Sequence, residues 1–289
     1  MALLTARGIS SLAVALLTRQ LVLPMTVSRV PGGEFAGDNG DTITVRVRTP
    51  RAARTQATPG ASITYDALNE TSVNVQLHHL YDAARLSDQD LSLNLVDFAV
   101  QVTEPQVASV AIGAEDELAT AMNGVAADDS FAATATAADT DDKILAAREA
   151  LSDADVPAGD RYLACAPDII TRLLLVDKFV RADAVGDGTA IREATVGRIY
   201  GFTVVESNGL TAGTAVAYHR SGFVLANRVP VPPRGLPSAH TATATNGGIG
   251  MRQIFQYQPD ILSDASVLST FAGANVVDSD RVYKLDTGS

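Results

Sequence analysis

The sequence is poor in the residue types on which several functions depend. It has no Trp, aromatic residues make up 5% of the chain, and Cys165 is the single cysteine among 289 residues. Without aromatic platforms on which bases stack, binding of single-stranded nucleic acid is not expected. One cysteine excludes an intrachain disulfide and a cysteine-based metal site. The apolar run around Cys165, RYLACAP, indicates a buried, inert thiol rather than a nucleophile.

Positive charge is also scarce. The chain has 22 Lys and Arg against 33 Asp and Glu, which gives a net charge of −11 and an isoelectric point near 4.7. Such a chain repels phosphate, so sequence-specific DNA binding is not expected. Hydrophobic residues make up 46% and charged residues 19%, enough for a real core in one large or two modest domains.

The N-terminus has little uninterrupted apolar sequence. The run from Ile9 to Leu17 is followed by Arg19 and by no convincing small-residue cleavage site. It is too short to span a bilayer. We therefore expect an amphipathic N-terminal arm, followed by an extended LVLPMTVSRV, rather than an export signal or a membrane segment.

The strongest helical pattern lies in Ser87–Gly124. Ser87 and Asp90 resemble a capping box, and Leu91, Leu95, Phe98 and Val102 follow at helical spacing. Pro105 suits a first turn, so a second helix is predicted over 104–123, about 30 Å long. Asn123-Gly124 predicts a left-handed stop. Glu115, Asp116 and Glu117 are expected on the outer side of this helix, which otherwise reads as an ordinary amphipathic core helix.

Two alternating segments predict a long hairpin. Ile43, Val45 and Val47 alternate with polar residues, and Ser72–Leu80 does the same. The link between them is polar and unusually long for a compact domain. The hairpin and link carry four arginines, a local basic patch that suggests attachment to an acidic surface, such as another copy of the chain. A solvated edge hairpin is the alternative. The four residues are Arg46, Arg48, Arg51 and Arg54.

The remaining pattern is an interleaved α+β chain. Helices are expected from Asp141 or Asp142 to Ser152 and after Pro167-Asp168. Strands are expected at 162–166, 202–207, 215–219, 223–227 and 251–257, and a turn and a last strand are expected between 270 and 285. A proline-rich passage covers 229–248. This order is neither a regular βαβ series nor a repeat array.

No catalytic group is predicted. The adjacent His78 and His79 point to opposite faces of a strand and cannot chelate one metal, and the acidic residues at 115–117 fan around a helix. GDGT at 186–189 lacks the context of a phosphate loop. We therefore expect no enzymatic activity, no cofactor and no metal.

Three segments carry a resemblance to a known family. They are VGRIYGFTVVESN, LSLNLVDFAVQVTEPQVASVAIGAEDELATAMN, and LVLPMTVSRV followed by GDTITVRVRTP. In this order they are similar to the major capsid proteins of tailed double-stranded DNA bacteriophages with the Hong Kong 97 type fold, within which the short-tailed-phage branch is the most similar. The resemblance covers about 20 to 285.

The resemblance implies an α+β fold with five parts. They are an N-terminal arm (1–32), an extended β-hairpin loop (33–82), a peripheral domain (83–136) with a spine helix (104–123), an axial domain (137–215), and return strands that complete the peripheral domain (216–289). The loop is expected to lie on a neighbouring subunit, where its arginines can meet Glu115, Asp116 or Glu117. Because Lys143, Lys178 and Lys284 all lie outside the hairpin, covalent crosslinking through a loop lysine is not expected. The passage 229–248 is either a surface loop or the short counterpart of an inserted domain.

The implied function is structural. Pentamers and hexamers of the chain would form an icosahedral head shell around packaged double-stranded DNA, with no membrane partner. Scaffolding, portal and decoration proteins are implied partners, and the particle would assemble in the host bacterial cytoplasm. Two alternatives remain: an encapsulin-like compartment shell, and a small-ligand-binding enzyme domain.

Overall fold

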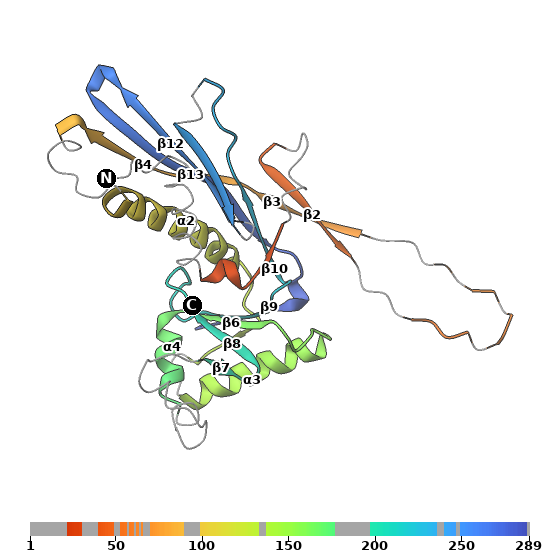
Figure 1. The fold of residues 1–289 in the computed structure, drawn as a ribbon. Helices are drawn as coiled ribbons and strands as arrows, with labels where there is room; N and C mark the ends of the chain where they lie inside the picture. Colours follow the sequence, from red (N-terminus) through yellow and green to blue (C-terminus); the bar gives the residue numbers. More distant parts are fainter. Residues whose placement is uncertain are drawn as a thin grey trace.

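The computed structural model describes 22–30, 40–48, 53–56, 58–60, 62–63, 65, 70–89, 99–132, 137–176, 197–235, 240–246 and 249–287. Within these residues the strands form two six-stranded sheets and a separate two-stranded hairpin. Figure 1 shows the first sheet above the long helix α2, the second sheet below with helices α3 and α4, and the hairpin projecting to one side.

Helix α2 (Glu104–Asn123) is the element that both sheets share. It follows a π-helical turn (Ala99–Thr103), and Pro105 lies in its first turn, as the sequence predicted. Its first half packs on the first sheet and its second half lies where the two sheets meet. The helix therefore forms a common support for the two parts. Its buried apolar residues are Val107, Val110, Ala111, Ala114, Leu118, Ala119 and Met122.

The left-handed stop predicted at Gly124 is wrong. Gly124 has φ −73° and ψ −12°, a right-handed conformation. The helix end is satisfied from elsewhere, because the buried Lys284 donates from Nζ to the carbonyl oxygens of Asn123 (2.7 Å) and Val125 (3.0 Å). The Asn123 side chain donates to the carbonyl of Gly209 at 3.0 Å.

The first sheet is built around β13 (Ser263–Val276). One edge of β13 pairs antiparallel with β4 (His78–Ser87), and the other pairs with β12 (Ile249–Gln258) and then with β10 (Phe223–Arg228). Short strand β1 (Ser28–Arg29) joins β10, and β11 (Thr241–Asn246) joins β12. A 3-10 turn (Pro259–Ile261) links β12 to β13.

The second sheet has the order β5-β14-β9-β6-β8-β7. Phe202 and Leu163 on one face pack against α3 and α4, while Ala164 and Tyr218 on the other face lie in the cluster that contains the end of α2. Both faces are thus covered. The elements are β5 (Asp129–Ser130), α3 (Ala137–Asp153), β6 (Arg161–Cys165), α4 (Pro167–Leu174), β7 (Arg198–Ile199), β8 (Phe202–Glu206), β9 (Ala215–His219), a 3-10 turn (Ser279–Arg281) and β14 (Val282–Asp286).

Several sequence expectations need correction. The segment expected to be extended contains a 3-10 helix (Leu23–Met25). Helix α3 begins at Ala137, before Asp141, whose buried carboxylate accepts a hydrogen bond from the Tyr200 hydroxyl at 2.6 Å instead of capping the helix. Of the turn and last strand expected between 270 and 285, residues 270–276 are instead the end of β13, and the last strand, β14, begins only at Val282. Strand β11 was not expected.

Some expectations lie outside the described residues. They are the arm at 1–21, Asp90 of the capping box, most of the helix at 91–102, and GDGT at 186–189. The boundaries of the five expected parts stay predictions. The expected division after 215 separates β6 and β8 from most of β9 and from β14, with which they share one sheet.

Candidate functional site

The hairpin leaves the body of the molecule at its base. β2 (Thr42–Arg48) pairs antiparallel with β3 (Glu70–Gln76), as the alternation predicted. Ile43 and Val75 near the base are buried, whereas β3 is exposed at Glu70, Thr71 and Ser72. Figure 1 shows both strands, and the described part of their link as a thin orange trace, extending away from the two sheets. An isolated two-stranded hairpin is marginal in water, so its outer part needs another surface.

Two of the four hairpin arginines, Arg46 and Arg54, have side chains within the described residues. Arg46 Nη1 lies 3.7 Å from Glu70 Oε2 on the paired strand, and the two side chains are 80% and 51% exposed. Arg54 is exposed in the link. Arg51 and the side chain of Arg48 lie outside the described residues. An ion pair as exposed as that of Arg46 contributes little to stability and exchanges readily for another partner.

The three acidic residues of α2 have three different environments, so the expectation that all lie on the outer side is wrong. Glu115 is half-buried and accepts the backbone N–H of Leu23 at 3.3 Å. Burial raises the pKa of Glu115, and hydrogen bonds from the backbone of Leu23 and Val22 oppose this rise. Asp116 is exposed. Helical geometry causes the difference, because consecutive residues turn by about 100° around the axis.

Glu117 binds the base of the hairpin. His78 Nδ1 lies 2.8 Å from Glu117 Oε1 and 2.9 Å from Oε2. His78 begins β4, immediately after Leu77, where the chain changes its pairing partner from β2 to β13. The sequence pattern raised His78 only as a possible metal ligand and gave no sign of this contact. The preceding alternation could locate the strand but not the helix that faces it.

A second contact fixes the same base to β13. The Asn275 side chain donates from Nδ2 to the Asn74 carbonyl at 2.8 Å. Gly273 lies so close to the backbone of Gln76 that a Cβ there would overlap the Gln76 carbonyl. These contacts border an open polar groove of about 510 Å³ between the hairpin and α2. Its lining residues are Thr42, Asn74, Gln76, His78, Glu117, Thr120, Ala121, Ala274 and Asn275.

The described residues offer little for chemistry. Cys165 is fully buried, and burial raises the pKa of its thiol, which makes the thiolate inaccessible. Across the described ranges, no three His, Cys, Asp or Glu side chains are placed to hold a metal ion. No helix in the described part of the chain is long and apolar enough to cross a membrane.

Comparisons with known proteins give one family and one fold. Residues 104–231 match the family model described as phage capsid protein. A structure from Mycobacterium phage Che8 is 21% identical, with a TM-score of 0.66 over 93% of this chain and 92% of that one. The capsid structure of cyanophage P-SCSP1u is 13% identical, also with a TM-score of 0.66, over 92% and 88%. This is the family signature and the fold of a phage major capsid protein.

A further structural match covers nearly the whole of both chains. A virus-like particle from Pyrococcus furiosus is 9% identical to this chain, with a TM-score of 0.57 over 96% of this chain and 97% of that one. No curated protein matches the chain. The predicted α+β fold of the Hong Kong 97 type is confirmed, whereas the short-tailed branch stays a prediction.

The family match places the capsid protein among structural proteins rather than enzymes, and among components of the virion. It begins at the first residue of α2 and ends three residues after β10. The match therefore includes most of the second sheet but neither strand of the hairpin. The hairpin is the part of this capsid protein for which the structure adds most to the sequence comparison.

Proposed function

We propose that this capsid protein assembles as pentamers and hexamers into an icosahedral shell around double-stranded DNA. The projecting hairpin is the observation that carries the proposal. Two link residues are large, apolar and strongly exposed: Ile63 is 60% and Tyr65 is 85% accessible. Residues of this kind on a projecting loop favour contact with another surface. Because every contact recurs in a closed symmetric shell, each one can be modest.

The neighbour's α2 is the proposed receptor for the hairpin. Glu117 and Glu115 already have partners within their own chain, so Asp116 is the acidic residue of the trio that faces solvent. We therefore assign Asp116 as the docking partner of the hairpin arginines. Arg46 would exchange its exposed contact with Glu70 for one in which less of the charge faces water. Arg48, Arg51 and Arg54 would add positive charge near the same surface.

The broader test is the size and content of the purified particles. We expect sedimentation and negative-stain microscopy of the full chain to show closed shells with five-fold and six-fold clusters. A stable monomer with the hairpin folded back on its own body would overturn the proposal. Scaffolding, portal and decoration proteins, and assembly in the host bacterial cytoplasm, belong to the same proposal. Isolating assembly intermediates from infected cells tests them.

The sharper test is a charge exchange. Arg46→Glu with Arg48→Glu should reduce the yield of closed particles at least tenfold, because like charges then face each other at every hairpin contact. Adding Asp116→Arg should restore part of that yield. Glu70→Gln is the matched control, since it removes the partner of Arg46 within the hairpin but leaves the arginine available. Wild-type yields from the double variant, measured with unchanged circular dichroism, would refute the docking role.

An encapsulin-like shell is the second candidate. The similarity to the virus-like particle from Pyrococcus furiosus over nearly the whole of both chains favours it. The hairpin and the acidic charge suit both candidates, so the contents of the shell decide between them. Packaged double-stranded DNA supports the phage head, whereas shells filled with one enzyme support the compartment. Nuclease-protected nucleic acid in purified particles is the measurement.

A further inference from the structure

Two chain crossings between the sheets lie side by side. The first connects β9 to β10 through 220–222, and the second connects β13 to β14 through 277–281. The carbonyl of Gly222 accepts the backbone N–H groups of Val277 (2.8 Å) and Asp278 (3.4 Å). A Cβ on Gly222 would lie 2.9 Å from Val282 Cγ2 and 3.0 Å from the carbonyl oxygen of Arg281. The crossings are therefore in direct contact, with no space for a larger residue at Gly222.

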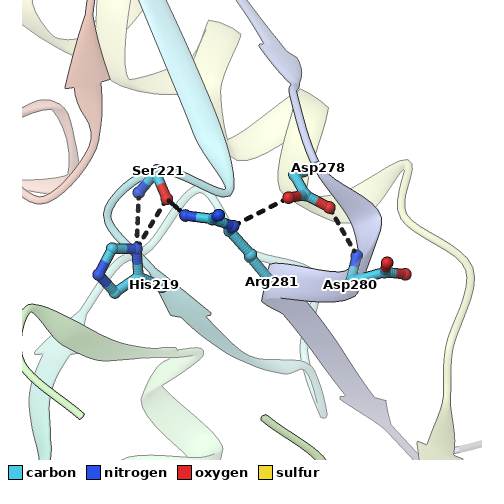
Figure 2. A network of polar contacts seen from close by, with 5 residues as sticks. All are labelled: His219, Ser221, Asp278, Asp280 and Arg281. Carbon is cyan, nitrogen blue, oxygen red and sulfur yellow. Dashed lines mark hydrogen bonds and ion pairs between the residues drawn. The ribbon is translucent and has the colours of Figure 1, made fainter. Parts of the chain in front are cut away.

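A chain of side-chain hydrogen bonds joins the same crossings, as Figure 2 shows. His219 Nδ1 lies 2.8 Å from Ser221 Oγ, and the Ser221 backbone N–H donates to the same nitrogen at 3.2 Å. Arg281 Nη1 donates to Ser221 Oγ at 2.5 Å. Arg281 Nε donates to Asp278 Oδ2 at 2.9 Å, and Asp278 Oδ1 accepts the N–H of Asp280 at 3.2 Å. The network therefore links the end of β9, and the crossing that follows it, to the 3-10 turn that precedes β14.

The chemistry of the donors sets the protonation of His219. A guanidinium can only donate, so Ser221 Oγ accepts from Arg281 and has one proton left to give. The Ser221 backbone N–H also donates to His219 Nδ1, so this nitrogen carries no proton, can accept from the hydroxyl as well, and leaves the proton of the neutral ring on Nε2. A protonated ring would have a donor at Nδ1. It would then lose the bond from the Ser221 N–H, and the Ser221 hydroxyl would have to accept from two cations, the imidazolium and Arg281.

We propose that this network is a proton-sensitive latch between the two chain crossings that join the sheets. With His219 neutral, the two crossings are held together and the sheets keep a fixed relative orientation. Protonation of His219 removes the acceptor of the Ser221 N–H and places two cations on the Ser221 hydroxyl, which weakens the network and loosens both crossings. The latch is a property of the single chain and does not depend on the proposed shell.

The charges that surround His219 favour the closed state. Burial lowers the pKa of His219, and the positive charges of Arg281 and Arg161 lower it further, while Asp160 opposes them. The unfolded chain therefore takes up this proton at a higher pH than the folded chain. The stability that neutral His219 contributes is fully present above its unfolded pKa, about 6.5, and is lost as the pH falls below that value. Acidification should open the latch.

Hydrogen exchange on the full chain tests the latch. Protection of peptides covering 219–224 and 276–282 is measured from pH 8 to pH 5, after correction for the intrinsic exchange rate. The wild type should lose protection at these two crossings on acidification, while the peptide covering β6 keeps its own. His219→Asn should remove this pH dependence, because the amide oxygen can replace Nδ1 as acceptor and does not titrate. His240→Asn, at an exposed histidine before β11, is the matched control and should leave the dependence intact.

Ser221→Ala supplies a second, pH-independent readout. It removes the link between His219 and Arg281, so protection at both crossings should fall roughly fivefold even at pH 8, about what one lost hydrogen bond produces. Equal pH profiles in the wild type and His219→Asn would overturn the latch. So would a loss of protection spread evenly over β6 and the crossings, since that would indicate global unfolding. Unchanged protection in Ser221→Ala would also contradict it.

Discussion

The hairpin and the second sheet are both built from β-strands, but they are stabilised in opposite ways. In the second sheet β9 is buried from Ala215 to Tyr218, with helices on one face and the end of α2 towards the other. In the described part of the hairpin, the buried residues lie at the base, where Ile43 and Val75 meet the body. The second sheet can hold itself together by apolar burial. The hairpin depends on a few polar and steric anchors, so its outer part is free to serve contacts between copies.

The largest expected effect separates the two regions directly. Phe202 is fully buried between the second sheet and its helices, so Phe202→Ala should lower the free energy of unfolding by about 3–5 kcal/mol. Tyr65→Ala in the exposed link should change it by less than about 0.5 kcal/mol while lowering the yield of closed particles. Denaturant unfolding of dissociated chains, together with particle counting, measures both. If Tyr65→Ala lowers the free energy of unfolding as much as Phe202→Ala does, the proposed contrast between the exposed link and the buried sheet is wrong.

The second prediction tests the steric anchor of the hairpin. Gly273→Ala places a methyl group against the carbonyl of Gln76, so either β13 or the end of β3 must move. We expect a loss of about 1–3 kcal/mol and increased hydrogen exchange over 70–76. Gly235→Ala is the control, because a Cβ there meets no atom within 4 Å. If both variants behave alike, Gly273 does not fix the hairpin.

The regular elements of both regions could be predicted from local pattern. Alternation located β2, β3 and β12, short apolar runs located β6, β8, β9 and β10, and helical spacing with Pro105 located α2. These signals work because the apolar residues of each element show, in its own sequence, which part of the strand or helix is buried. The long strand β13 has no such mark. Buried hydroxyls interrupt its apolar positions, and their partners are distant: Ser266 Oγ donates to Gln106 Oε1 at 2.9 Å.

The candidate site was predictable only in outline. The sequence pattern predicts the projecting hairpin and the acidic helix. It does not reveal which residues of the same chain bind the acidic side chains. Which of Glu115, Asp116 and Glu117 remains available depends on where Leu23 and His78 pack, and both are more than 30 residues away in sequence. The predicted left-handed stop of α2 was wrong for the same reason. Lys284, in the last strand, donates a hydrogen bond to the carbonyl at the end of the helix.

The smallest expected effect compares the two anchors that α2 provides. Glu115 binds the backbone of the body, and burial raises its pKa, so the folded chain holds a proton there at a higher pH than the unfolded chain does. Stability from this group is therefore present below the unfolded pKa, about 4.3, and is lost as the pH rises through the folded pKa. Glu115→Gln should be slightly more stable than the wild type at pH 7, because the amide oxygen still accepts from Leu23 without a buried charge.

The difference between Glu115→Gln and the wild type should shrink as the pH falls towards 4, where both side chains are neutral. Glu117→Gln is the matched variant on the hairpin side. It weakens a contact to His78, whose side chain is 52% exposed, so it should change the free energy of unfolding by less than about 1 kcal/mol. Denaturant unfolding from pH 4 to pH 8 measures both variants. If Glu115→Gln were destabilising at pH 7, the charge itself would be what holds Leu23. The body would then rely on a polar anchor as much as the hairpin does.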